Sequence, residues 1–275
     1  MNRNKIKNSL TGFPKKQGMY NPSHEKDACG FGFIANIDNI PKHEIIHQAL
    51  EIVHNLDHRG AVSADPLAGD GAGILIQIPD EFFRLELGKK NYFLPELGNY
   101  GVGITFFPNS QTEIIKIQSI IKDIIVKEGL ELICWRDVPV NNAVLGVSVK
   151  ANEPSIKQLF IRKGKRLKSE NELERKLYVV RKLITNTLHK DKIYDENFYI
   201  PSLSTRTIVY KGMVLAPNLS KYYLDFQNKS FKSAMAMFHQ RFSTNTFPSW
   251  QLAQPFRYLC HNGEINTVQG NKNWI

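Results

Sequence analysis

Cysteine is scarce in this 275-residue chain, and a long apolar run is missing. Its three cysteines, Cys29, Cys134 and Cys260, lie far apart and form no CxxC or Cys/His spacing. This pattern argues against a disulfide framework and against a metal site, and it favours a reducing compartment. No apolar run approaches the roughly 20 residues that a membrane-spanning helix needs, and the basic N-terminus lacks the apolar core of a secretory signal. We therefore expect a cytoplasmic protein, or one of the plastid stroma if its gene is organellar, with no membrane partner.

Acidic residues are outnumbered, with 26 Asp and Glu against 36 Lys and Arg, for a formal net charge of +10. A basic excess is one feature of nucleic-acid-binding proteins. The densest basic cluster, RKGKRLK at 162–168, contains no interleaved aromatic side chain. We interpret it as a solvated loop or helix end, and we expect no nucleic-acid partner.

The spacing of apolar residues predicts an α+β fold, with helices and strands alternating along the chain. Helices are expected at 41–60, where Gly60 should end the helix, and at 110–129, 170–190 and 219–226. Strands are expected at 29–37, 74–79, 99–108, 130–140, 157–163, 235–243 and 257–265, with a hairpin-like pair within 197–215.

Cys29 opens the stretch CGFGFIA and has two interpretations. It is either a small buried thiol at the start of a strand, the commoner case, or a nucleophile. A thiol needs a base, since its reference pKa is about 8.5. If residues 1–28 were removed, the freed α-amine of Cys29, with a pKa of about 7.7–8.0, would supply that base on the same residue.

The segment from 241 to 267 holds further candidates. Asn262 and Gly263 could aim a side-chain amide and a backbone N–H at a developing oxyanion, although Asn-Gly is also the strongest short signal for a hairpin turn. Arg241 could bind a carboxylate through two hydrogen bonds, or it could be structural. The glycines at 69–73 lack the lysine and hydroxyl of a phosphate loop and predict a tight turn into a strand.

Five short motifs in a fixed order carry a family resemblance: CGFGFIA, DHRGA, DGAGI, QRFSTNT and CHNGEINT. Together they resemble the class II glutamine amidotransferases, which are N-terminal-nucleophile hydrolases. The longer phrases LDHRGAVSADPLAGDGAGILIQIP, FYIPSLSTRTIVYKGMVL and RFSTNTFPSWQLAQPFRYLCHNGEINT are similar to the amidotransferase domain of glutamate synthase large subunits. The resemblance runs from about residue 18 to 275.

This resemblance implies a four-layer αββα sandwich, with residues 1–28 as a propeptide and 29–275 as the amidotransferase domain. It implies that Cys29 is the nucleophile and that its α-amine is the base. Asn262 and Gly263 match the oxyanion hole, and Arg241 matches the residue that holds the carboxylate of glutamine. Arg59 and Thr244 are expected in supporting roles.

The resemblance also implies that glutamine is cleaved through a thioester to glutamate and ammonia. In this family the ammonia is channelled to a second site, where 2-oxoglutarate is aminated and reduced with FMN and an iron–sulfur cluster. We expect no cofactor within the present segment, and Cys134 and Cys260 as core residues. Expected partners are L-glutamine, the rest of the synthase chain, and either ferredoxin or a small NADPH-oxidising subunit.

Family members continue beyond HNGEI, so we expect a fragment whose domain is incomplete at the C-terminus. Two alternatives stay open at this point. The chain could belong to another class II enzyme that passes ammonia to a phosphoribosyl, sugar or aspartyl acceptor. It could also be an inactive fragment that acts only in binding or assembly.

Overall fold

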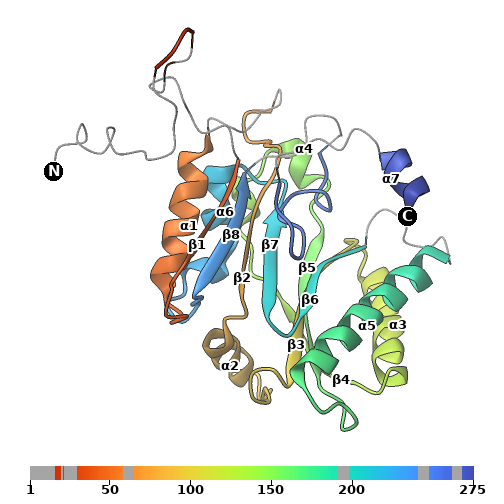
Figure 1. Ribbon diagram of the computed structural model, residues 1–275. Coiled ribbons are helices and arrows are strands. Elements are labelled where there is room, and N and C mark those ends of the chain that lie inside the picture. The colour runs from red at the N-terminus through yellow and green to blue at the C-terminus, as the bar shows by residue number, and fades with distance from the viewer. Residues whose placement is uncertain are drawn as a thin grey trace.

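The computed structural model describes residues 16–19, 21, 30–57, 65–190, 198–240, 248–261 and 268–275. Within these residues, eight strands form two antiparallel four-stranded sheets (Figure 1). The first sheet consists, in spatial order, of β1 (Phe31–Ala35), β8 (Met235–Gln240), β2 (Ala72–Gln77) and β7 (Thr207–Gly212). The second consists of β4 (Glu131–Asp137), β5 (Ser155–Arg162), β3 (Tyr100–Phe107) and β6 (Tyr199–Ser204).

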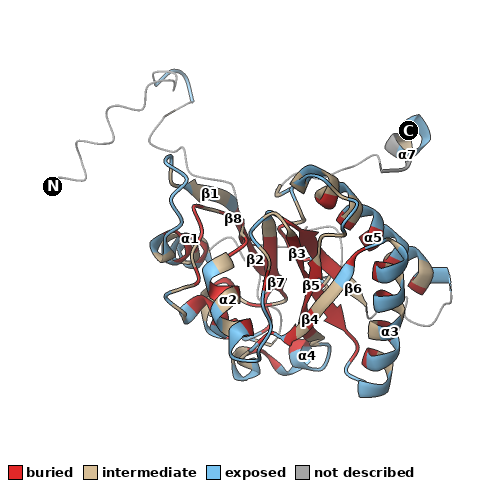
Figure 2. Ribbon diagram, turned by 90° about the horizontal axis from the view of Figure 1, so that it is seen from below, coloured by how far each residue is buried: buried red, intermediate tan, exposed pale blue. Residues whose placement is uncertain are grey.

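Three long helices cover the outer sides of the two sheets. Figure 2 shows α1 (His43–Asn55) on one side and α3 (Gln111–Lys127) and α5 (Glu170–Lys190) on the other, with both sheets between them. The shorter elements are α2 (Asp80–Gly88), η4 (Asn142–Val144), α4 (Val147–Lys150), η5 (Ala216–Asn218), α6 (Leu219–Tyr222), η6 (Leu224–Gln227) and α7 (Val268–Trp274). The predicted α+β class is confirmed, and the order of layers agrees with an αββα sandwich.

The local sequence explains where α3 and α5 begin and end. Ser110 caps the N-terminus of α3 by accepting a hydrogen bond from the Glu113 N–H. Just beyond the helix, Gly129 has a φ of +75°, a left-handed conformation that favours glycine. On α5, the predicted apolar stripe is buried as expected, at Leu173, Leu177, Val180 and Ile184.

Two predicted helices differ from the structure in their extent. The helix predicted to stop at Gly60 ends at Asn55, because the apolar spacing that buries Ile46, Ala49 and Val53 does not continue past Leu56. The helix predicted over 219–226 is divided into α6 and η6 by the extended backbone of Tyr223. The sequence analysis missed α2, although its Phe82, Phe83 and Leu87 side chains are buried at helical spacing.

The hairpin predicted within 197–215 is wrong in its described part, which begins at Phe198. β6 and β7 follow each other along the chain, but β6 pairs with β3 in the second sheet and β7 pairs with β2 in the first. Both strands are buried along almost their whole length, whereas a hairpin with one wet face would alternate. The connection also lacks the Asn-Gly or Gly-containing turn that a two-residue hairpin loop needs. The chain therefore passes from one sheet to the other at Thr205.

The strand predicted over 257–265 is also wrong in its described part. Residues 256–259 form a tight turn, in which the backbone N–H groups of Phe256 and Leu259 each donate to the other residue's carbonyl oxygen, at 2.8 and 3.0 Å. His261 is not paired with a strand, because its backbone groups bond to a side chain described below. None of the helices in the described part of the chain is both long and apolar enough to cross a membrane.

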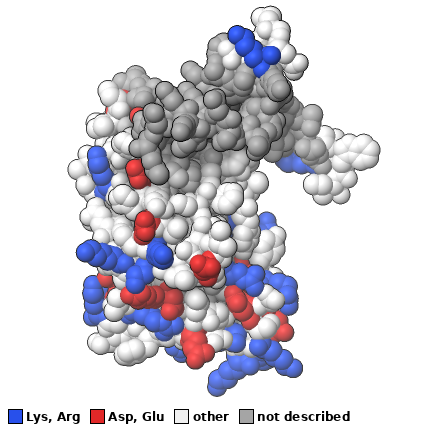
Figure 3. Space-filling model, turned by 60° about the vertical axis from the view of Figure 1, so that its left-hand side comes forward, with Lys and Arg blue, Asp and Glu red and all other residues white. Residues whose placement is uncertain are grey.

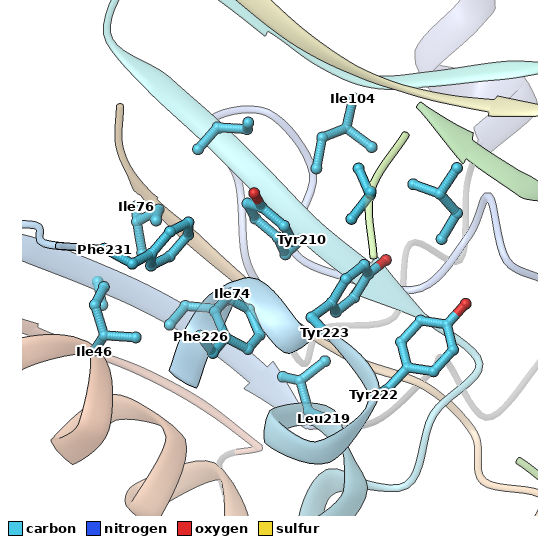
Figure 4. Packing of buried hydrophobic residues seen from close by; sticks show 14 of the residues in the cluster. Ile46, Ile74, Ile76, Ile104, Tyr210, Leu219, Tyr222, Tyr223, Phe226 and Phe231 are labelled. Carbon is cyan, nitrogen blue, oxygen red and sulfur yellow. The ribbon is translucent and has the colours of Figure 1, made fainter. Parts of the chain in front are cut away.

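The core between the layers is rich in aromatic rings. Figure 4 shows Tyr210 of β7 facing Tyr223, Phe226 and Phe231, and the ring centroids of Tyr210 and Tyr223 lie 5.0 Å apart. These rings come from β7 and from the 223–231 segment. Their packing fixes that segment against the first sheet.

Candidate active site

The predicted site residues all fall outside the described residues. They are Cys29, Arg59, Arg241, Thr244, Asn262 and Gly263. Three described residues adjoin them along the chain: Gly30 follows Cys29, Gln240 precedes Arg241, and His261 precedes Asn262. The positions of these three neighbours show which of the predicted segments approach one another.

The neighbours of Cys29 and Arg241 are hydrogen-bonded. The backbone N–H of Gln240 donates to the carbonyl oxygen of Gly30 at 2.6 Å. One residue further into the sheet, Phe31 of β1 is paired with His239 of β8. The residues that adjoin Cys29 and Arg241 therefore lie side by side at one end of the first sheet.

His239 connects this end of the sheet to His261. Its Nε2 lies 2.9 Å from the carbonyl oxygen of His261, and since a carbonyl only accepts, the proton of the ring is on Nε2. The His239 ring is buried and stacks on Phe31, with centroids 6.2 Å apart and an interplanar angle of 12°. The neighbour of Asn262 is thus tied to the pair of strands that flank Cys29 and Arg241.

A second side chain holds the backbone of His261 from the other side. The Nε2 of Gln254 donates to the His261 carbonyl oxygen at 3.0 Å, and the His261 N–H donates to Gln254 Oε1 at 3.1 Å. The Gln254 side chain is buried. Both bonds require one orientation of the carboxamide, because a flipped amide would set donor against donor and acceptor against acceptor.

The segment that carries Gln254 rests on a buried lysine. Lys211 is fully buried on β7, and its Nζ donates to the Gln251 carbonyl oxygen at 2.8 Å. The same Nζ lies 4.6 Å from the ring centroid of Phe256 and 5.0 Å from that of Tyr199. Burial, with a smaller effect from the charge of Arg257, lowers the pKa of Lys211 to about 7.

The segment that carries Gln254, residues 248–261, runs beside the first sheet and is drawn in blue in Figure 1. A glycine of the sheet leaves space for it. A Cβ on Gly73 would collide with the Gln254 carbonyl oxygen and would lie 2.6 Å from the Lys211 Cβ. The register places Phe31, His239, Gly73 and Lys211 in one row across the sheet. The predicted entry into a strand at 69–73 agrees with β2, which begins at Ala72; the backbone bends at Asp70, and Gly71 has a φ of +115°.

The first described residue after Arg59 is Asp65. It accepts hydrogen bonds from the Leu67 N–H at 3.1 Å and from the Ser148 N–H at 3.3 Å, and these two bonds do not lead to the neighbours of Cys29, Arg241 and Asn262. The Leu67 bond is the main cause that lowers the pKa of the Asp65 carboxyl group. The hydrogen bonds described above therefore bring together the neighbours of Cys29, Arg241 and Asn262, while Asp65 bonds to α4.

The sequence model of the family described as "Glutamine amidotransferases class-II" matches residues 29–275. The chain belongs to the class II glutamine amidotransferases.

The individual relatives that match this chain have more specific names, and all three described here are glutamate synthases. It is 47% identical over 262 residues to the glutamate synthase [NADPH] large chain of Bacillus subtilis (strain 168), an alignment that covers 95% of this chain and 17% of the relative. It is 43% identical over 251 residues to ferredoxin-dependent glutamate synthase 1 of Arabidopsis thaliana, covering 91% and 15%. It is 43% identical over 275 residues to glutamate synthase [NADH] of Saccharomyces cerevisiae, covering 95% and 12%. The chain thus spans less than a fifth of the length of these relatives.

Burial raises the thiol pKa of both described cysteines of the chain. Cys134 packs in the core, as predicted, and burial raises its pKa to about 11. Cys260 is only half-buried, donates its S–H to the Phe238 carbonyl oxygen at 3.3 Å, and has a pKa raised by burial to about 12. Among the described residues, no group of three or more metal-binding side chains is arranged to hold an ion.

Three residues that organise this end of the first sheet were not predicted from the sequence. Lys211 could have been found, because a lysine inside the apolar run TIVYKGMV of a buried strand requires a partner. Gln254 and His239 carry no comparable signal, since their partner is the backbone of His261, and no side-chain pattern in the sequence marks a bond to backbone.

Proposed function

We propose that this chain hydrolyses L-glutamine to glutamate and ammonia, with Cys29 as the nucleophile. Residues 1–28 act as a propeptide, and residues 29–275 form the amidotransferase domain. One observation carries the proposal: the neighbours of Cys29, Arg241 and Asn262 meet through the Gly30–Gln240 and His239–His261 hydrogen bonds. The start of the family match at Cys29 supports the same boundary.

In this proposal, removal of the propeptide frees the α-amine of Cys29, which takes the proton from its own thiol. The sulfur attacks the carboxamide carbon of glutamine and forms a tetrahedral oxyanion. Collapse of this intermediate gives a thioester, and ammonia leaves with the proton held by the α-amine. Water then attacks the thioester, gives a proton to the amine, and releases glutamate with the thiol restored.

The remaining site residues bind glutamine and stabilise the oxyanion. Asn262 and Gly263 donate hydrogen bonds to the oxyanion, which is stabilised most where donors are fixed beforehand. Arg241 binds the α-carboxylate of glutamine through two parallel hydrogen bonds. Arg59 and Thr244 support this arrangement. The α-amine of Cys29 suits a base that works near neutral pH.

We further propose that the chain is the glutaminase part of a glutamate synthase, which passes its ammonia to 2-oxoglutarate. The names of the relatives support this acceptor over a phosphoribosyl, sugar or aspartyl group. FMN and an iron–sulfur cluster are assigned to other parts of the whole enzyme. The two described cysteines do not form a cluster site together, because Cys134 lies on β4 of the second sheet and Cys260 bonds to Phe238 of the first. The electron donor is ferredoxin or a small NADPH-oxidising subunit, and the compartment is the cytoplasm or the plastid stroma.

Replacement of Cys29 in the full-length enzyme tests the proposal. Cys29→Ser should abolish glutamine-dependent glutamate formation, whereas added ammonia should still support it. Cys260→Ser is the matched control, because a hydroxyl can keep the bond to the Phe238 carbonyl oxygen, and it should retain activity. Glutamine hydrolysis that survives Cys29→Ser at the wild-type rate would refute the proposal.

A further inference from the structure

The peptide units on both sides of His261 are held by side chains rather than by a strand. Its carbonyl oxygen accepts from both Gln254 Nε2 and His239 Nε2, and its N–H donates to Gln254 Oε1. Half-buried loop residues more often bond their backbone to water or to neighbouring backbone. Here three directed bonds fix the residue that immediately precedes Asn262.

We propose that Gln254 is a positioning residue of the oxyanion hole: by binding both backbone groups of His261, it sets the direction in which the chain enters Asn262–Gly263. This inference rests on the proposed function, in which Asn262 and Gly263 stabilise the tetrahedral intermediate. Gln254 does not touch the substrate in this account. It acts through the His261 backbone.

The chemistry makes such a constraint effective. An oxyanion hole lowers the barrier only if its donors already point at the place where negative charge develops. A carbonyl that is bonded on one side by Gln254 and on the other by His239 cannot rotate without losing both bonds. Because the His261 carbonyl and the Asn262 N–H share one planar peptide unit, the bonds on that carbonyl also fix the orientation of this unit.

Gln254 is itself held in place by the first sheet. Its backbone carbonyl fits against Gly73, where any Cβ would collide with it. Three residues earlier, the Gln251 carbonyl oxygen accepts from the buried Nζ of Lys211. The Gln254 side chain that binds His261 is therefore anchored to Gly73 of β2 and Lys211 of β7, in the same row across the sheet as His239 and Phe31.

Two substitutions in the full-length enzyme test the role of Gln254. Gln254→Glu keeps the size and the bond accepted from the His261 N–H but removes the donor to the carbonyl, whereas Gln254→Ala removes both bonds. Loss of a whole oxyanion-hole donor costs about 10²–10³-fold in kcat, so misalignment should lower kcat for glutamine hydrolysis by about tenfold or more. The KM for glutamine should stay within about twofold, since the ground state makes little use of the hole.

A second readout separates positioning from a general structural role. Alkylation of Cys29 by iodoacetamide forms no oxyanion, so its rate should stay within about twofold of wild type in both variants. Gln111→Ala is the matched control, because Gln111 is exposed on α3. It should change neither kcat for glutamine hydrolysis nor the rate of Cys29 alkylation. In wild-type enzyme, hydrogen exchange should show the His261 N–H protected, and this measurement does not depend on the folding of any variant.

Each failure points to a different error. If wild-type enzyme does not hydrolyse glutamine, the proposed function is wrong. If it does, but the Gln254 variants keep kcat within about twofold, the positioning role is wrong. A parallel fall in kcat and in the alkylation rate would show that Gln254 only supports the fold. Unprotected exchange at His261 would also overturn the inference.

Discussion

Arg136 and Asp225 form a buried ion pair with two hydrogen bonds, of 2.9 and 2.7 Å, which joins β4 of the second sheet to η6. Gln158 of β5 accepts from Arg136 at 2.7 Å, and the hydroxyl of Tyr210 on β7 donates to Asp225 at 2.9 Å. The network therefore connects both sheets through one carboxylate. Burial is the largest influence on the Arg136 guanidinium, yet the bonds to Asp225 outweigh it and raise the pKa of Arg136.

Removal of the Asp225 carboxylate should lower the stability of the fold, because it leaves the buried guanidinium of Arg136 without its counter-ion. We expect Asp225→Ala to lower the free energy of unfolding by about 3–5 kcal/mol, measured by urea denaturation. The exposed pair between Glu81 and Lys232, at 2.8 Å, offers a control. Glu81→Ala should cost less than about 1 kcal/mol. Equal losses in the two variants would contradict the account of the network.

Lys211 should make stability depend on pH. Its pKa is lowered to about 7 in the folded chain from an ordinary value of 10.5, so between these values the unfolded chain binds more protons. The contribution of Lys211 to stability therefore rises with pH across this window and is constant below about pH 7. The difference in unfolding free energy between wild type and Lys211→Met should change by up to about 1.4 kcal/mol per pH unit.

Urea titrations at pH 7.5 and 9.5 measure this difference. Wild type should gain about 2–3 kcal/mol relative to Lys211→Met over that interval. Lys221→Met, which removes an exposed lysine, corrects for the general effect of pH on a lysine substitution. A wild-type-to-variant difference that does not change with pH would show that Lys211 keeps its ordinary pKa.

Gly73 should not tolerate a side chain. A Cβ there would press on the Gln254 carbonyl oxygen and on the Lys211 Cβ, so Gly73→Ala has to displace the 254–255 backbone. Overpacking of this kind costs about 1–3 kcal/mol. At Gly88, the last residue of α2, a Cβ would meet nothing within 4 Å, and Gly88→Ala should be neutral or up to about 1 kcal/mol stabilising. The ranking of the two melting temperatures checks the prediction, and a Gly73→Ala chain as stable as Gly88→Ala would refute it.

Periodicity predicted the elements that bury one continuous face. α3, α5 and β3 appear where expected, because their apolar residues repeat at the spacing of a helix or fill a fully buried strand. The pairing of β6 and β7 was not predictable in this way. Both are apolar throughout, and sequence proximity favoured a hairpin over the sheet change that the structure shows.

The candidate site was predictable only where residue order carries a family motif. Among the described residues on the face shown in Figure 3, basic and acidic side chains are interspersed, and neither sign forms a separate patch that would mark a site. The Gln254–His261 hydrogen bonds could not be predicted from the sequence, for a physical reason. A side-chain amide that replaces a strand partner leaves no periodic trace, and RYLCHNGEI then looks like an ordinary strand.

The most direct test of the account is the N-terminus of the active protein. Enzyme that hydrolyses glutamine would be labelled with a glutamine analogue that carries an electrophilic diazoketone, digested, and examined by mass spectrometry. We predict that the label is on Cys29 and that the labelled peptide begins with Cys29 and a free α-amine. Labelled, active protein that still carries Met1–Ala28, or a label on another residue, would contradict the proposed mechanism.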